Sequence, residues 1–89
     1  MTREELKGRI HHYIVENFLF GADEVDDDAP LIDEGILDST GVLEMVVFLD
    51  EELGVSVSDE EVLPERFESV NALTAFAAER LDRTLGSLA

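Results

Sequence analysis

Residues 31–53 read LIDEGILDSTGVLEMVVFLDEEL, a loop that leads into an amphipathic helix. Asp38 is a good N-cap residue, because its carboxylate can accept hydrogen bonds from free N–H groups of the first helical turn. Leu37 and Val42 have the spacing of a hydrophobic staple around that cap. The pattern places Ser39 at the first helical position, where free N–H donors and the helix dipole favour a phosphate on its hydroxyl. We expect the function to lie at this serine.

The predicted helix carries apolar residues on more than one side. The expected core stripe consists of Val42, Met45, Val46, Leu49 and Leu53. The residues on or near the opposite side are Leu43, Val47 and Phe48, with Thr40, Glu44 and Glu51. Either this helix is buried on most sides, or the second face is a docking surface, apolar in its middle and acidic at its rim. A small domain cannot cover every face of a helix, so we favour a docking surface.

These residues resemble a known family. Residues 35–40 read GILDST, and the helix behind them ends in DEELG at 50–54, which is similar to the acyl carrier and peptidyl carrier proteins. The resemblance extends over nearly the whole chain, from about Leu6 to Leu81. It implies an all-α fold, a small four-helix bundle with three longer helices, a short third helix and a long first loop.

The resemblance also implies a covalent cofactor. In this family the serine after an aspartate carries a 4′-phosphopantetheine arm, which here means Ser39 after Asp38. The family usually has leucine or another apolar residue after that serine, whereas this chain has Thr40 and Gly41. The departure leaves attachment intact and bears on which modifying enzyme and which partners fit best.

Partner enzymes are implied in the same way. Thr40 follows the serine directly, and the residues that match partner-contacting positions of the family are Leu43, Glu44, Val47, Asp50, Glu51 and Glu52. The expected partners are a phosphopantetheinyl transferase that takes the arm from coenzyme A, an acyl- or aminoacyl-loading enzyme, and downstream biosynthetic enzymes with basic docking surfaces. Cargo would be held as a thioester on the arm's thiol.

The charge of the chain agrees with basic protein partners. Asp and Glu number 22 against 6 Lys and Arg, a formal net charge of −16, and no Lys or Arg occurs between Ile10 and Glu65. Nucleic acid is excluded because phosphate binding needs cationic side chains. Anionic membrane surfaces are disfavoured for the same reason. One interpretation of the negative charge is that it steers the chain toward basic proteins. The other is that the charge serves solubility alone.

Length and composition indicate one small carrier domain over residues 1–89, with an ordered core from about residue 3 to 85. The chain is 45% hydrophobic and has no cysteine, so it has no disulfide framework, thiolate metal site or cysteine nucleophile. The N-terminus has no apolar signal region, and no apolar run reaches transmembrane length. We therefore expect a cytoplasmic monomer.

Helix signals divide the rest of the chain. Thr2 and Glu5 form a capping box for a helix that runs to about Leu19 and ends before Gly21. Ser58 and Glu61 form another box, for a single short helix over about 59–63 that the following proline stops. Ser69 caps the last helix, whose predicted core stripe is Leu73, Phe76, Ala77, Leu81 and Leu85.

No pattern indicates catalysis or a metal site. His11 and His12 are adjacent on the first helix, so they cannot form an i, i+4 metal pair, and nothing places either beside Ser39 as a general base. The acidic loop at 22–30 lacks the sixth-position glycine of an EF-hand. Leu31, Ile32, Ile36 and Leu37 are expected to hold the later part of the loop against the helices.

We therefore interpret the chain as a free-standing carrier, not an enzyme, and expect it in a secondary-metabolite pathway of polyketide or nonribosomal-peptide type. The alternatives are a fatty-acid synthesis carrier and an acidic interaction adaptor without a prosthetic group.

Overall fold

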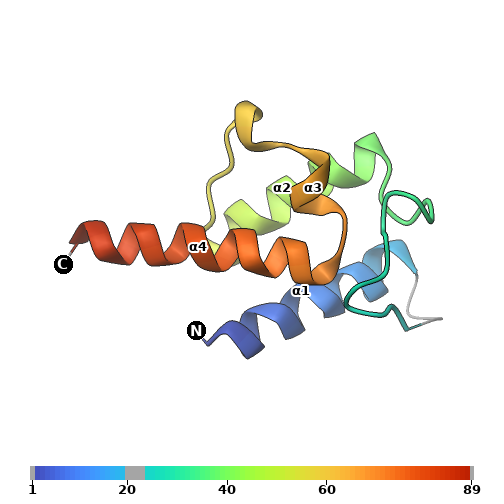
Figure 1. The fold of residues 1–89 in the computed structure, drawn as a ribbon, viewed down its shortest axis with the longest axis horizontal. Coiled ribbons are helices and arrows are strands. Elements are labelled where there is room, and N and C mark those ends of the chain that lie inside the picture. The colour runs from blue at the N-terminus through green and yellow to red at the C-terminus, as the bar shows by residue number, and fades with distance from the viewer. Residues whose placement is uncertain (1, 20–23, 89) are drawn as a thin grey trace.

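The computed structural model describes the backbone of residues 2–19 and 24–88, and side chains as far as Leu81. Within these residues the chain forms a bundle of helices without strands, as predicted. In chain order the elements are α1 (Arg3–Phe18), α2 (Ser39–Leu53), the 3-10 helix η1 (Asp59–Glu61), α3 (Pro64–Phe67) and α4 (Val70–Leu88). Figure 1 shows α1 and α4 running in opposite directions, with the long α1–α2 loop at the end of the bundle away from both termini.

The core is one cluster of apolar side chains drawn from all four α-helices and from the loops. On α1, Leu6, Ile10 and Ile14 are buried, as their four-residue spacing predicts. Side chains from the other segments complete the cluster: Val25, Leu31, Leu37, Met45, Phe48, Leu49, Leu53, Val55, Phe67, Val70, Leu73 and Ala77. In α4, Leu73, Phe76 and Ala77 are buried and Leu81 is half-buried, which confirms that stripe; Leu85 lies outside the described side chains, and Gly21 outside the described residues.

The prediction for Phe48 is wrong. We placed it off the core stripe of α2, but its side chain is only 7% exposed and its ring stacks on Tyr13 of α1, with centroids 4.1 Å apart. Stacked aromatic pairs add packing energy beyond the area they bury. Helical periodicity gives the direction in which Phe48 points, whereas the reach of α1 decides which directions are covered.

The prediction that Pro64 ends a short helix is also wrong. The helix begun at Ser58 stops after three residues as η1, and Pro64 is instead the first residue of α3. Proline is tolerated at the first helical position, where its missing N–H has no helical partner. Leu63 is extended, as the residue before a proline tends to be.

The other helix ends follow the predicted capping. Thr2 accepts from the N–H of Glu5 at 3.1 Å, and Ser69 accepts from the N–H of Ala72 at 3.0 Å. Gly54 ends α2 in the left-handed conformation, with φ 69° and ψ 24°.

The long loop before α2 is held by the start of α4. Asn71 donates its backbone N–H to Asp27 and its side-chain amide to Asp28, at 3.0 and 2.6 Å. The N–H of Leu31 donates to the carbonyl of Glu68 at 2.7 Å. Leu31 and Leu37 are buried and Ile36 is half-buried, as expected, but Ile32 is 37% exposed. These hydrogen bonds and buried side chains fix the position of the loop from which the chain enters α2.

Two glycines in helices are expected to respond differently to alanine. A Cβ on Gly8 would meet nothing within 4 Å, so Gly8→Ala should stabilise the fold by about 0.5–1 kcal/mol through helix propensity. A Cβ on Gly41 would lie 3.1 Å from the Phe18 ring and 3.3 Å from the Asp38 carboxylate. Crowding of that kind cancels the propensity gain. Urea unfolding of both variants checks this; equal stabilisation would contradict close packing at Gly41.

Candidate functional site

Ser39 lies at the capped start of α2. Asp38 has an extended backbone, and its Oδ1 accepts from the N–H of Gly41 at 2.7 Å, which confirms the predicted cap. Leu37 is buried directly before it and anchors the turn in the core. The Ser39 side chain is exposed at the first helical position. Asp38 occupies the N–H of Gly41, whereas the N–H groups of Ser39 and Thr40 have no helical acceptor and are the first-turn donors for an anion attached there.

The outward face of α2 combines apolar and acidic side chains. Leu43 is 62% exposed and Val47 53% exposed, as predicted. The other candidate contact residues, Thr40, Glu44, Asp50 and Glu51, are exposed as well. Of the apolar residues expected on this face, only Phe48 turns away, toward α1.

The described ion pairs do not neutralise the acidic side chains of that face. Lys7 pairs with Asp27 at 2.9 Å, and Arg9 lies 3.8 Å from Glu52 at the far edge of α2. Among the side chains that the structure describes, no ion pair involves Glu44, Asp50 or Glu51. A basic protein surface is the complementary partner for such a face.

Beside Ser39 the structure forms a groove that the sequence did not predict. Its volume is about 320 Å³, and Ser39 is the one polar residue that lines it. We call it the Ser39 groove; its lining residues are Ile32, Ser39, Val42, Leu43, Val62, Leu63, Pro64 and Phe67. The α3 wall was missed because the short helix was placed before Pro64. In the structure two apolar residues of this groove, Ile32 and Leu63, are each 37% exposed.

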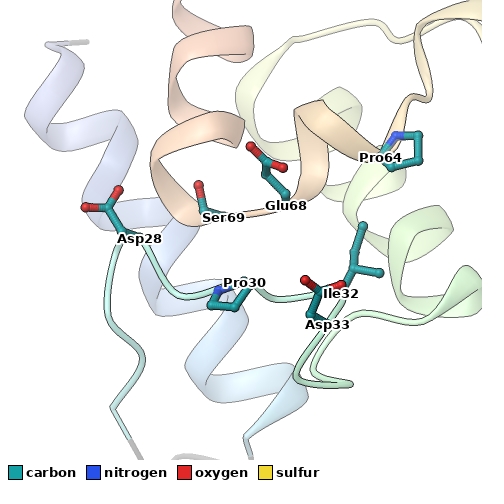
Figure 2. A pocket seen from close by; sticks show the side chains of 7 residues that line it. All are labelled: Asp28, Pro30, Ile32, Asp33, Pro64, Glu68 and Ser69. Atoms are coloured by element: carbon teal, nitrogen blue, oxygen red, sulfur yellow. The ribbon is translucent and has the colours of Figure 1, made fainter.

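An acidic cavity adjoins the Ser39 groove across Ile32 and Pro64, which line both. Figure 2 shows it between the loop that carries Asp28 and Asp33 and the α3–α4 corner. Its volume is about 290 Å³, and the lining residues are Asp28, Pro30, Ile32, Asp33, Pro64, Glu68 and Ser69. Among the side chains of residues 2–19 and 24–81, no group of His, Asp and Glu is arranged to hold a metal ion. The carboxylates make this end of the groove negative.

Neither histidine lies at the serine site: one contacts an aspartate of the long loop and the other is exposed. His11 is half-buried, with Nδ1 3.1 Å from Asp27 Oδ1, and His12 is exposed. Hydrogen bonds from Lys7 and His11 hold the pKa of Asp27 below its usual value. This cluster joins α1 to the long loop and has a structural role.

The α2–α3 connection is held by α4 through Arg80. Its guanidinium donates to the carbonyl of Ser56 at 2.6 Å and to the carboxylate of Glu61. Glu61 also accepts from the backbone N–H of Ser58 at 3.1 Å, as the predicted capping box requires. The Ser58 N–H, and then the Arg80 hydrogen bond, lower the pKa of Glu61 from 4.5 to about 2.

This shift predicts a pH dependence of stability. Because the folded-state pKa of Glu61 is depressed, its contribution is fully present above about pH 4.5 and is lost as the pH falls toward about 2. The difference in melting temperature between wild type and Glu61→Gln should therefore shrink over that range. The other carboxylates titrate in both proteins, so subtracting one melting temperature from the other removes most of their effect. A constant difference between pH 6 and pH 2.5 would contradict the assigned pKa.

Comparison with known proteins places this chain in a family. Residues 10–77 match the profile of the family described as "Phosphopantetheine attachment site". The chain is 32% identical to the probable acyl carrier protein PigG of a Serratia species, over 79% of this chain and 82% of PigG. It is 29% identical to the acyl carrier protein of Petrotoga mobilis, over 92% of this chain and 94% of that protein.

A solved structure is similar as well. A chain in a crystal structure described as that of an FAD-dependent dehydrogenase superposes with a TM-score of 0.69 at 36% identity, over 76% of this chain and 97% of that chain. The fold, the capped serine and these relatives agree: the chain belongs to the phosphopantetheine-attachment family of acyl carrier proteins, is a carrier and not an enzyme, and has 4′-phosphopantetheine as its cofactor.

Proposed function

We propose that Ser39 is the attachment residue and that the protein presents acyl or aminoacyl cargo to successive biosynthetic enzymes. The observation that supports this most is the exposed Ser39 hydroxyl at the first position of α2, beside the Asp38 cap. A phosphodiester at this position is stabilised by first-turn N–H groups and by the helix dipole. The serine needs no base of its own, because an external transferase activates it.

The Ser39 groove fits the rest of the cofactor. Its apolar lining begins at Ser39, so an arm attached there can lie along Val42 and Phe67 instead of extending into water. The bound arm supplies a terminal thiol that holds cargo as a thioester. Asp28, Asp33 and Glu68 at the far end disfavour cargo with a free carboxylate.

Partner recognition falls to the outward face of α2. Leu43 and Val47 supply exposed apolar area, while Thr40, Glu44, Asp50 and Glu51 surround it with polar and acidic groups. Apolar centres with polar rims are typical of protein interfaces. We propose that the phosphopantetheinyl transferase and the loading enzyme both dock here through basic surfaces.

The proposed pathway is secondary metabolism, with cargo oxidation on the carrier. The similar solved structure is described as an FAD-dependent dehydrogenase. The match covers 76% of this chain and 97% of the matching chain, so that chain is shorter than this one and has the size of a carrier. We infer that a flavin-dependent dehydrogenase is a partner class and removes H₂ from carried cargo, with flavin as the acceptor. Fatty-acid synthesis is the alternative pathway.

Three further properties are part of the proposal: one carrier domain over residues 1–89, a monomeric state, and a cytoplasmic location. Within the part of the chain that the structure describes, no helix is long and apolar enough to cross a membrane.

Intact mass spectrometry tests the proposal. Incubation with coenzyme A and a broad-specificity phosphopantetheinyl transferase should add the mass of one phosphopantetheine, located by peptide mapping at Ser39. A protein that gains no mass would instead support the acidic adaptor. Loading of an aminoacyl group onto the modified protein by an adenylating enzyme would favour the nonribosomal-peptide type of pathway over fatty-acid synthesis.

A further inference from the structure

The segment between α2 and α3 forms one wall of the Ser39 groove, yet little of it is buried. Val62, Leu63 and Pro64 line the groove opposite Val42 and Leu43 of α2. Within residues 56–63 every side chain is exposed or half-buried. The nearest fully buried apolar side chains are Val55, before this segment, and Phe67, after it. Within the segment only Val57 and Val62 pack against the core, and both are half-buried, so apolar packing holds this wall weakly.

One side chain from α4 holds the segment near both ends. Arg80 donates to the carbonyl of Ser56 at 2.6 Å and to the carboxylate of Glu61, five residues later. The planar guanidinium has several donors in a rigid fork, so it can bind both acceptors at once. Figure 1 shows the segment leaving α2, rising away from the bundle and returning into α3, with α4 beneath.

Neighbouring contacts strengthen this arrangement. Arg66 donates to the backbone carbonyl of Glu61 at 3.2 Å, and its guanidinium lies 4.9 Å from the centroid of the Phe76 ring. The side chains of Arg80 and Glu61 are 23% and 20% exposed, so solvent screens the pair less than an exposed one. The groove wall formed by Val62 and Leu63 begins directly after Glu61.

We propose that Arg80, acting through Glu61, is a positioning residue for the Ser39 groove: it holds the 56–63 segment at the distance from α2 at which the groove receives carried cargo. The cargo part rests on the proposed function of Ser39. The hydrogen bonds of Arg80 described above lie on the α2–α3 connection and not at Ser39, so the rate of phosphopantetheine transfer should not depend on them.

Hydrogen exchange on the unmodified protein is the first test. Amides of residues 56–63 should exchange about tenfold faster in Arg80→Met and in Glu61→Gln than in wild type. Arg80→Lys keeps the charge without the fork and should fall between. The matched control is Arg9→Met, which breaks an exposed pair 3.8 Å long with Glu52 and should leave this segment unchanged. The two residues share one contact and each has others, so the increase in the double variant should be smaller than the product of the two single increases.

Cargo shielding is the second test. After modification and loading with an octanoyl group, the thioester should hydrolyse about threefold faster in Arg80→Met and Glu61→Gln than in Arg9→Met, because water reaches the groove.

Unchanged exchange would overturn the positioning role. Faster exchange with unchanged hydrolysis would overturn its link to cargo. If Arg80→Met does not fold by circular dichroism, Glu61→Gln decides. Failure of modification at Ser39 would refute the proposed function, while the exchange result would still stand.

Discussion

Ser39→Ala is expected to gain no mass when it is incubated with coenzyme A and a phosphopantetheinyl transferase, while wild type is converted completely. The reason is chemical, because alanine has no hydroxyl to accept the phosphoryl group. The variant should still fold. Ser39 is exposed and its side chain accepts no capping bond, so the free energy of unfolding should change by no more than about 0.5 kcal/mol.

Ser56→Ala is the matched control. Ser56 is exposed on the α2–α3 connection and only its backbone carbonyl contacts Arg80, so the substitution removes a hydroxyl without affecting the site. It should be modified at the wild-type rate. Modification of Ser39→Ala, or its loss in Ser56→Ala, would overturn the assignment of the attachment residue.

Reversing charge on the outward face of α2 should give the second largest effect. Glu44→Lys with Glu51→Lys places two cations on a face where we find no compensating ion pair among the described side chains. Association with a basic loading enzyme then loses electrostatic steering, and the loading rate at low salt should fall about tenfold or more. Raising the salt should slow wild type and leave the variant almost unaffected, because screening acts on the steering term.

The control is the same change of charge elsewhere on the protein. Glu16 on α1 and Glu60 in η1 are exposed and lie off the α2 face, so Glu16→Lys with Glu60→Lys should retain most of the wild-type rate. Equal losses in the two double variants would show that net charge matters and the α2 face does not. The measurement is loading by the cognate enzyme, as a function of ionic strength.

Local signals predicted much of the site. Asp38 caps α2 through the N–H of Gly41, and Ser39 follows it at the helix start, because both depend on residues at most three positions apart. Leu43 and Val47 are exposed as helical periodicity indicated. Gly41 departs from the family pattern, and the structure gives a packing reason, because the end of α1 brings Phe18 against it.

The sequence by itself determined the helical class, the caps at Thr2, Asp38 and Ser69, and the acidic face of α2, because these depend on short-range spacing and on composition. Only the tertiary structure decided that α1 covers Phe48 and that Arg80 reaches Glu61. It also decided that the loop and α3 enclose a groove beside Ser39. The physical reason is that burial and ion pairing depend on which distant segments approach each other, and one-dimensional patterns do not record that distance.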